Sequence, residues 1–86
     1  MASFRVEWRA SAAKELRKID RQVIPRIVEA AEQLACEPLP PGAKKLQGTE
    51  FIYRIRVGDY RIVYEVAEAA ASVTIVRVRH RKEVYR

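Results

Sequence analysis

The spacing of hydrophobic residues changes at Phe51, and this change limits the fold more than any other property of the chain. From Phe51 onward apolar and polar residues alternate with period two, which is typical of half-buried β-strands. Gly58 and Asp59 interrupt the alternation and predict a two-residue hairpin turn, because glycine readily adopts the positive φ that such turns need. The second half of the chain is therefore predicted to contain an antiparallel hairpin.

A two-residue loop also fixes the register of this hairpin. The predicted pairs are Val57 with Tyr60, Arg56 with Arg61, Ile55 with Ile62 and Arg54 with Val63. Arg56 then lies directly opposite Arg61 on the face away from the core, and like charges in this position destabilise a ladder by up to about 1 kcal/mol. We expect this face to bind an anion. The alternative is that both side chains extend into water, where salt screens their repulsion.

A last strand is predicted from about Val73 to Arg79. Strict alternation places Val73, Ile75, Arg77 and Arg79 on one face of this strand and Thr74, Val76 and Val78 on the other. The sheet is therefore expected to become more polar toward its C-terminal edge.

Helical spacing dominates the first half of the chain. After a short predicted strand between Phe4 and Trp8, apolar residues predict a first helix of roughly ten residues and a second from about Val23 to Ala35. These helices should form an antiparallel hairpin on one face of the sheet. The expected fold is α+β with the order β-α-α-β-β-β, in which a mainly antiparallel four-stranded sheet packs against an N-terminal helical hairpin within one domain, residues 1–86.

Basic residues are concentrated in the second half of the chain. Residues 1–43 hold seven Lys and Arg against six Asp and Glu, whereas residues 44–86 hold ten against five, and the net charge is +6. Because a guanidinium group matches two phosphate oxygens and keeps its charge at any cellular pH, the arginine-bearing face is predicted to bind phosphate, and RNA is the first partner to consider. The alternative is a solvated basic face that serves solubility.

Other properties of the sequence exclude several classes of protein. Cys36 is the only cysteine, so we expect no internal disulfide and no cysteine metal site, and the thiol is expected to be buried and inert. No apolar run reaches the roughly 18–20 residues of a membrane span, and the first residues do not resemble a signal peptide. We therefore expect a soluble cytoplasmic protein that uses no metal, no cofactor and no membrane.

Three segments together resemble the RelE branch of the RelE/ParE toxin superfamily: Lys45–Gly48, Tyr53–Tyr64 and His80–Tyr85. The resemblance implies the RelE-like microbial RNase fold and the toxin of a type II toxin-antitoxin pair. It further implies a ribosome-dependent endoribonuclease that cleaves mRNA in the ribosomal A site and so inhibits translation. Such cleavage uses the 2′-OH of the substrate as nucleophile and needs no metal, only proton transfer and cations around the phosphate.

The family's catalytic positions fall on five residues of this chain: Arg54, Arg56, Arg61, Arg81 and Tyr85. RelE proteins often carry lysines where this chain has Arg54 and Arg56, and a guanidinium group is a poor base, so these two are expected to orient the phosphate. Tyr85 is the leading acid-base candidate and could also stack on a base; the alternative is an ordinary C-terminal aromatic residue.

His80 is a further catalytic candidate, because an imidazole titrates near neutral pH and Arg81 follows it; the alternative is that alternation turns its ring toward the core. Contacts with RNA or the ribosome are expected from other basic residues, and the candidates are Lys44, Lys45, Arg77, Arg79, Lys82 and Arg86. Tyr53, Tyr60 and Tyr64 share the apolar face of the hairpin and are predicted to be core residues rather than base-stacking ones.

The resemblance also implies partners. These are the ribosome, mRNA and a cognate antitoxin protein. The resemblance is compatible with a heterotetramer of toxin and antitoxin. Two other functions stay open at this point. A ParE-like toxin would share the fold but inhibit DNA gyrase through protein contacts, without any need for the arginine and tyrosine set. A non-catalytic RNA-binding module would keep the basic face without cleaving RNA.

Overall fold

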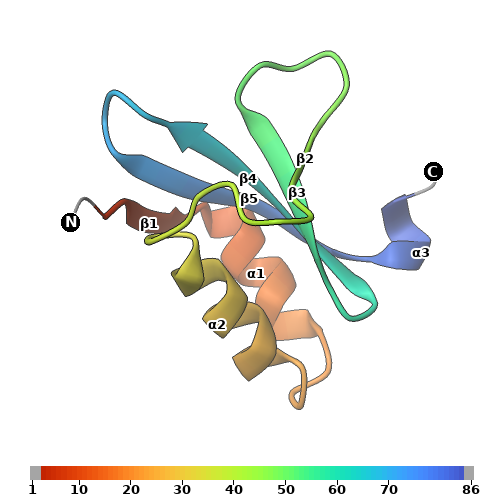
Figure 1. Cartoon of the computed structure of the whole chain (residues 1–86). Coiled ribbons are helices and arrows are strands. Elements are labelled where there is room, and N and C mark those ends of the chain that lie inside the picture. Colours follow the sequence, from red (N-terminus) through yellow and green to blue (C-terminus); the bar gives the residue numbers. More distant parts are fainter. Residues whose placement is uncertain (1–2, 85–86) are drawn as a thin grey trace.

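The computed structural model describes residues 3–84, which form a curved sheet with two helices packed against it (Figure 1). In chain order the elements are β1 (Arg5–Trp8), α1 (Ala10–Lys18), α2 (Ile24–Gln33), β2 (Lys44–Lys45), β3 (Ile52–Val57), β4 (Tyr60–Ala67), β5 (Ser72–His80) and α3 (Arg81–Val84). Within the described residues, no helix is both long and apolar enough to cross a membrane.

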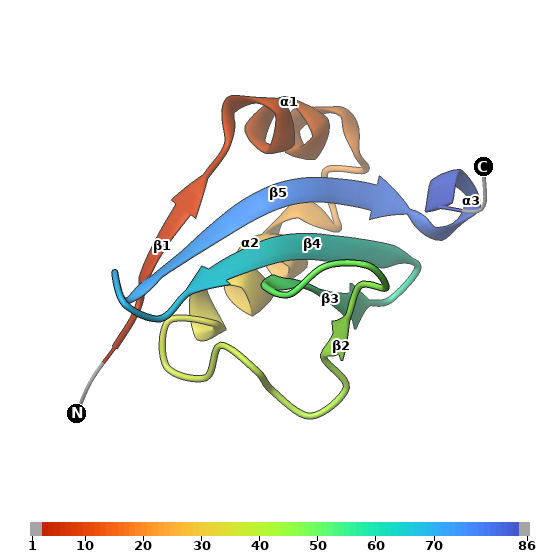
Figure 2. The ribbon, with the colours of Figure 1, turned by 90° about the horizontal axis from the view of Figure 1, so that it is seen from above.

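The sheet has five strands in the order β1-β5-β4-β3-β2, which Figure 2 shows from above. β1 runs parallel to β5, and every other neighbouring pair is antiparallel. The predicted α+β class and order of elements are confirmed. The strand count differs from the predicted four, because Lys44 and Lys45 pair with Arg54 and Tyr53 and so add a strand that is too short to show a period in the sequence.

The register of the central hairpin agrees with the prediction. Val57 lies opposite Tyr60, and Arg56 lies opposite Arg61. Gly58, the first residue of the turn, has φ of 59°, a conformation that costs most other residues free energy. The hairpin therefore holds two arginines side by side on the face away from the core, as the alternation required.

The predicted faces of the last strand are wrong beyond Val76. Val63 pairs with Arg77 whereas Tyr64 pairs with Ile75, so Val76 is an extra residue and β5 contains a bulge. A bulge shifts the alternation by one position. As a result Val78 joins Val73 and Ile75 in the core, while Arg77 turns to the opposite face.

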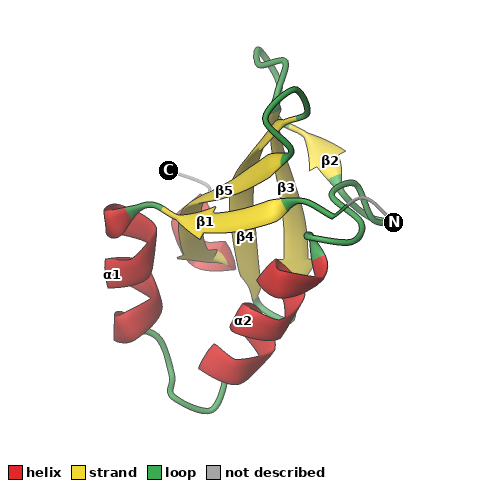
Figure 3. Ribbon diagram, turned by 90° about the vertical axis from the view of Figure 1, so that its left-hand side faces the viewer, coloured by secondary structure: helices red, strands yellow, loops and turns green. Residues whose placement is uncertain are grey.

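The core lies between the sheet and the two long helices, which are neighbours below the strands in the view of Figure 1 and red in Figure 3. Helix residues contribute Ala12, Ile27, Ala31 and Leu34, and strand residues contribute Ile62, Tyr64, Val66, Val73, Ile75 and Val78. Pro25 lies at the start of α2, where its missing N–H costs no hydrogen bond. Cys36, expected to be buried, is exposed instead, because α2 ends before it.

α1 packs beside the C-terminal half of β5, where β1 has already ended. There the backbone N–H of Val78 donates a hydrogen bond to Oε1 of Glu15 (2.9 Å). A carboxylate from α1 thus takes the place of a neighbouring strand at this edge of the sheet. The predicted helical hairpin is confirmed, with α1 closest to this edge.

Tyr64 connects the core to the loop after α2. Its ring is fully buried and stacks against Tyr53 with 6.0 Å between ring centroids, and its hydroxyl donates a hydrogen bond to the carbonyl oxygen of Pro38 (2.7 Å). Burial, together with the nearby phenol of Tyr53, raises the pKa of Tyr64 from 10 to about 12. The folded protein therefore holds this proton more tightly than the unfolded chain does.

This difference predicts a loss of stability at alkaline pH. Below pH 10 both states keep the proton; between pH 10 and about 12 the unfolded chain releases it first, so the free energy of unfolding of the wild type should fall by roughly 2–3 kcal/mol. Tyr64→Phe should be less stable at neutral pH by about 1 kcal/mol, since it loses the hydrogen bond, but should lack this part of the alkaline decline. Urea unfolding from pH 8 to 12 measures both, and parallel curves would contradict the prediction.

Candidate functional site

Six basic residues share the sheet face that lies opposite the helices, and we call this surface the arginine face. The pairing shows the arrangement, because residues directly opposite each other on neighbouring strands point to the same side. One row runs from Arg56 through Arg61 to Arg79, and a second runs from Lys44 through Arg54 and Val63 to Arg77. The bulge at Val76 brings the two β5 arginines onto this face.

Part of the arginine face is hollowed into a cleft of about 300 Å³. Its lining residues are Gly42, Lys44, Arg54, Ile55, Arg56 and Arg61. Among these described residues all four charged side chains are cations, so the cleft concentrates positive charge. An anion that enters it would meet several hydrogen-bond donors at once.

Arg61 lies at the centre of this site, on the strand between β3 and β5. Among the charged residues whose burial the structure describes, it alone is buried, with 5% of its surface exposed. Arg56 and Arg79 flank it across the ladder. The ladder therefore gathers three arginines at neighbouring positions on one face, and guanidinium groups gathered in this way favour the binding of an anion.

Glu15 distinguishes the β5 arginines from those in the cleft. Its Oε2 lies 3.1 Å from Nε of Arg79 and 3.6 Å from a terminal nitrogen of Arg77. These ion pairs partly neutralise the outer end of each row. No pattern in the sequence predicts this contact, because Glu15 is one of several charged residues within the same short helix.

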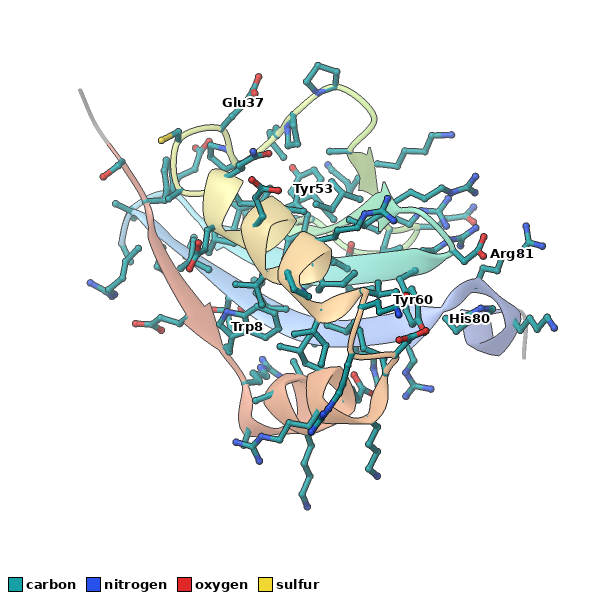
Figure 4. All side chains as sticks on the ribbon, turned by 90° about the horizontal axis from the view of Figure 1, so that it is seen from below. Trp8, Glu37, Tyr53, Tyr60, His80 and Arg81 are labelled. Carbon is teal, nitrogen blue, oxygen red and sulfur yellow. The ribbon has the colours of Figure 1, made fainter. Side chains whose placement is uncertain are left out.

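Arg81 lies at the end of the sheet beside the β3–β4 turn, and it is not among the residues that line the cleft. Its backbone N–H donates to the carbonyl oxygen of Asp59 (2.7 Å), and its Nε lies 3.9 Å from Oδ1 of the same residue. The side chain is 63% exposed, so the guanidinium can leave this weak pair. Figure 4 shows it on the first turn of the last helix.

His80 faces the core side of the sheet, opposite Tyr60. The two rings meet edge to face, with 5.1 Å between centroids. Figure 4 labels both residues. Nδ1 of His80 accepts a hydrogen bond from the backbone N–H of Lys82 (3.2 Å). Because His80 immediately precedes α3, this contact is an N-cap: it satisfies one of the N–H groups that a helix leaves unpaired in its first turn.

The remaining predicted residues lie in different parts of the molecule. Lys44 lies in the cleft, whereas Lys45 is opposite Tyr53 and therefore points to the other side of the sheet. Lys82 is exposed on α3. Tyr85 and Arg86 lie outside the described residues. The tyrosines predicted to be core residues, Tyr53, Tyr60 and Tyr64, do pack in or against the core, and the site contains none of them.

The chemistry open to this site follows from its donors. A cleft that contains three guanidinium groups and one ammonium group can hold a phosphodiester and stabilise additional negative charge on it. Among residues 3–84, no group of three or more His, Cys, Asp and Glu side chains is placed to hold a metal ion. Cleavage of a phosphodiester would also need a group near the cleft that can lose and regain a proton.

Comparison with known proteins gives consistent results. The family described as "ParE toxin of type II toxin-antitoxin system, parDE" matches residues 6–85. Toxin RelG of Mycobacterium tuberculosis is 32% identical to this chain, and the alignment covers 96% of this chain and 97% of RelG. The match thus extends over both helices and the whole sheet.

Solved structures agree with this result. In the RelBE2 toxin-antitoxin complex from Mycobacterium tuberculosis, one chain superposes with a TM-score of 0.83 at 29% identity, covering 93% of each chain. In the archaeal RelE-RelB complex from Pyrococcus horikoshii the TM-score is 0.81 at 30% identity, covering 92% of this chain and 96% of the other. The α+β fold described above is therefore shared with these structures.

Proposed function

Since the chain belongs to the RelE/ParE family of type II toxin-antitoxin toxins, we propose that it is a metal-independent endoribonuclease that cleaves mRNA in the ribosomal A site and so inhibits translation. The observation that carries this proposal is the cationic cleft around Arg61. Three guanidinium groups and one ammonium group line this cleft, and such donors bind a phosphate and stabilise additional negative charge on it. A toxin that acted only through protein contacts would not need such a cleft.

In the proposed reaction the 2′-OH of the substrate attacks the adjacent phosphorus, and the bond to the 5′-oxygen of the next nucleotide breaks. One proton leaves the 2′-OH and one is delivered to the departing 5′-oxygen, so no other reactant is needed. Arg54, Arg56 and Arg61 hold the phosphate and stabilise the charge of its pentacoordinate state. Tyr85 is proposed as the proton-transfer group, with Arg81 near the leaving oxygen.

The proposed partners follow from this reaction. Lys44, Arg77, Arg79, Lys82 and Arg86 are proposed to contact the RNA backbone, and Lys45, on the other side of the sheet, would contact a different part of the ribosome. A cognate antitoxin is the expected protein partner, because the similar chains from Mycobacterium tuberculosis and Pyrococcus horikoshii were solved in toxin-antitoxin complexes. The ribosome and mRNA place the proposed activity in the cytoplasm.

A direct assay tests this function. Purified protein is added to ribosomes that carry a defined mRNA with an empty A site, and the message is mapped by primer extension. We expect a cut within the A-site codon. The cut should persist when EDTA removes transition metals, with magnesium in excess over EDTA so that the ribosome stays intact. Intact mRNA that the protein binds in a gel-shift experiment would instead support a non-catalytic RNA-binding module.

A second candidate function is inhibition of DNA gyrase, which the ParE description of the matching family favours. It is tested with the same protein preparation in a gyrase supercoiling assay. Blocked supercoiling together with uncut mRNA would replace the nuclease proposal with this one.

The contacts of His80 support a positioning role rather than proton transfer. Because its Nδ1 caps α3, His80→Ala should weaken the first turn by about 1 kcal/mol and slow mRNA cleavage roughly 5- to 10-fold, whereas His80→Asn, with another effective capping group, should restore most of the rate. Cleavage rates from pH 6 to 8 distinguish the two roles. An acid-base residue would leave both variants at least about 10²-fold slower and would change the pH profile.

A further inference from the structure

A second hollow lies at the end of the β3–β4 hairpin that is away from the Gly58–Asp59 turn. This groove has a volume of about 510 Å³ and lies where β3 begins, β4 ends and the β4–β5 turn follows. Its apolar lining consists of Leu39, Phe51, Tyr53, Val66, Ala67, Ala69 and Ala70. The nuclease proposal assigns no role to any of these residues.

Two side chains in this groove are unusually exposed for their type. Phe51 is 59% exposed and Leu39 is 48% exposed. Among the described residues, these are the two large hydrophobic side chains that are exposed. Burying a Phe or Leu side chain stabilises a protein or a complex by roughly 1.5–3 kcal/mol. Exposed large apolar residues that gather in one hollow are typical of a docking surface. A small-molecule pocket would instead enclose its ligand on most sides.

The charge of this groove is opposite to that of the rest of the protein. Its charged lining residues are Glu50, Glu65 and Glu68, whereas the chain as a whole carries a net charge of +6. Three carboxylates repel the phosphates of RNA, so the groove does not extend the nucleic-acid surface. They favour a partner that places cationic side chains around an apolar one.

From these observations we infer that the groove docks a segment of the cognate antitoxin that inserts an apolar side chain between Leu39 and Phe51 and places Lys or Arg beside the three glutamates. This inference rests on the proposed function for the existence of an antitoxin partner. It adds where one contact is made and which chemistry that segment must have. The groove and the arginine cleft share no lining residue, so the contact proposed here is distinct from the cleft.

The apolar part is tested with the double variant Leu39→Ser, Phe51→Ser and the protein encoded by the neighbouring reading frame as the antitoxin probe. Binding of the purified chains is measured by calorimetry, and we expect affinity to fall about 10- to 100-fold while ribosome-dependent cleavage stays within twofold of the wild type. Cys36→Ser, at another exposed position, is the matched control and should bind normally. Unchanged affinity of the double variant would overturn the inference.

The charged part has its own test. In the triple variant Glu50→Gln, Glu65→Gln, Glu68→Gln, we expect affinity to fall about 10-fold at low salt and to depend less on salt than in the wild type. Equal or tighter binding would overturn the inference.

A second copy of this chain is the alternative occupant of the groove. If analytical ultracentrifugation showed that the wild type is a homodimer and that Phe51→Ser dissociates it, the inference would also be overturned. A wild type that binds antitoxin through the groove but cuts no mRNA would refute the nuclease proposal alone.

Discussion

Arg61→Ala is expected to slow mRNA cleavage on the ribosome about 10³-fold. Arg61 is the buried cation of the cleft, and the strand pairing places this residue between Arg56 and Arg79. A preorganised donor that stabilises transition-state charge typically contributes between about 10² and 10³ in rate, and a single arginine in phosphoryl transfer can contribute more. The rate is measured under single-turnover conditions with saturating protein, so that weaker binding does not contribute.

The control for this experiment is Arg17→Ala. Arg17 is an exposed cation in the last turn of α1, so its removal changes the net charge equally without touching the cleft. We expect its cleavage rate to stay within about twofold of the wild type, as is usual for surface substitutions. Arg61→Lys should recover only part of the rate, since an ammonium group lacks the planar fork of a guanidinium. If Arg17→Ala and Arg61→Ala were equally slow, net charge rather than the cleft would explain the activity.

Tyr85→Phe is expected to slow cleavage by about 10²- to 10⁴-fold, the range for loss of a general acid or base. Tyr85 lies outside the described residues, but it follows α3 in the sequence, and α3 begins with Arg81 beside the β3–β4 turn. The substitution keeps the ring, so any stacking on a base remains and only the hydroxyl is lost. Single-turnover cleavage of the same mRNA gives the rate.

Tyr53→Phe is the matched control, because it removes a hydroxyl from a tyrosine on the other face of the sheet. Its cleavage rate should stay close to that of the wild type. Binding of Tyr85→Phe to programmed ribosomes should also be unchanged, which would separate a chemical defect from a binding defect. A Tyr85→Phe rate within tenfold of the wild type would mean that another group transfers the proton.

The parts of the fold predicted correctly are those in which local and long-range signals agree. The hairpin register followed from the Gly58–Asp59 turn and the alternation on both sides of it, and only one pairing satisfies both. α2 was equally clear, because its apolar stripe and Pro25 mark the same helix. The three arginines of the cleft came from that register, so this part of the site was readable in advance.

The errors have specific physical causes. The bulge at Val76 leaves no trace in a run where valine and arginine simply alternate, so both faces of the end of β5 were misassigned. The two-residue strand β2 is too short to show any period. The contact between the ring of His80 and the N–H of Lys82 could not be predicted, because Ser, Thr, Asp and Asn are the usual signals of an N-cap.

The contact between Glu15 and the N–H of Val78 has a consequence for self-association. Open strand edges recruit strands from other molecules and so start fibrils. On this flank β1 covers β5 from Ser72 to Ile75, the N–H of Arg9 bonds to the carbonyl of Ile75, and the carboxylate of Glu15 accepts from the N–H of Val78 beyond the end of β1. One acidic side chain thus occupies a backbone donor that an added strand would need, and this opposes fibril growth from this edge.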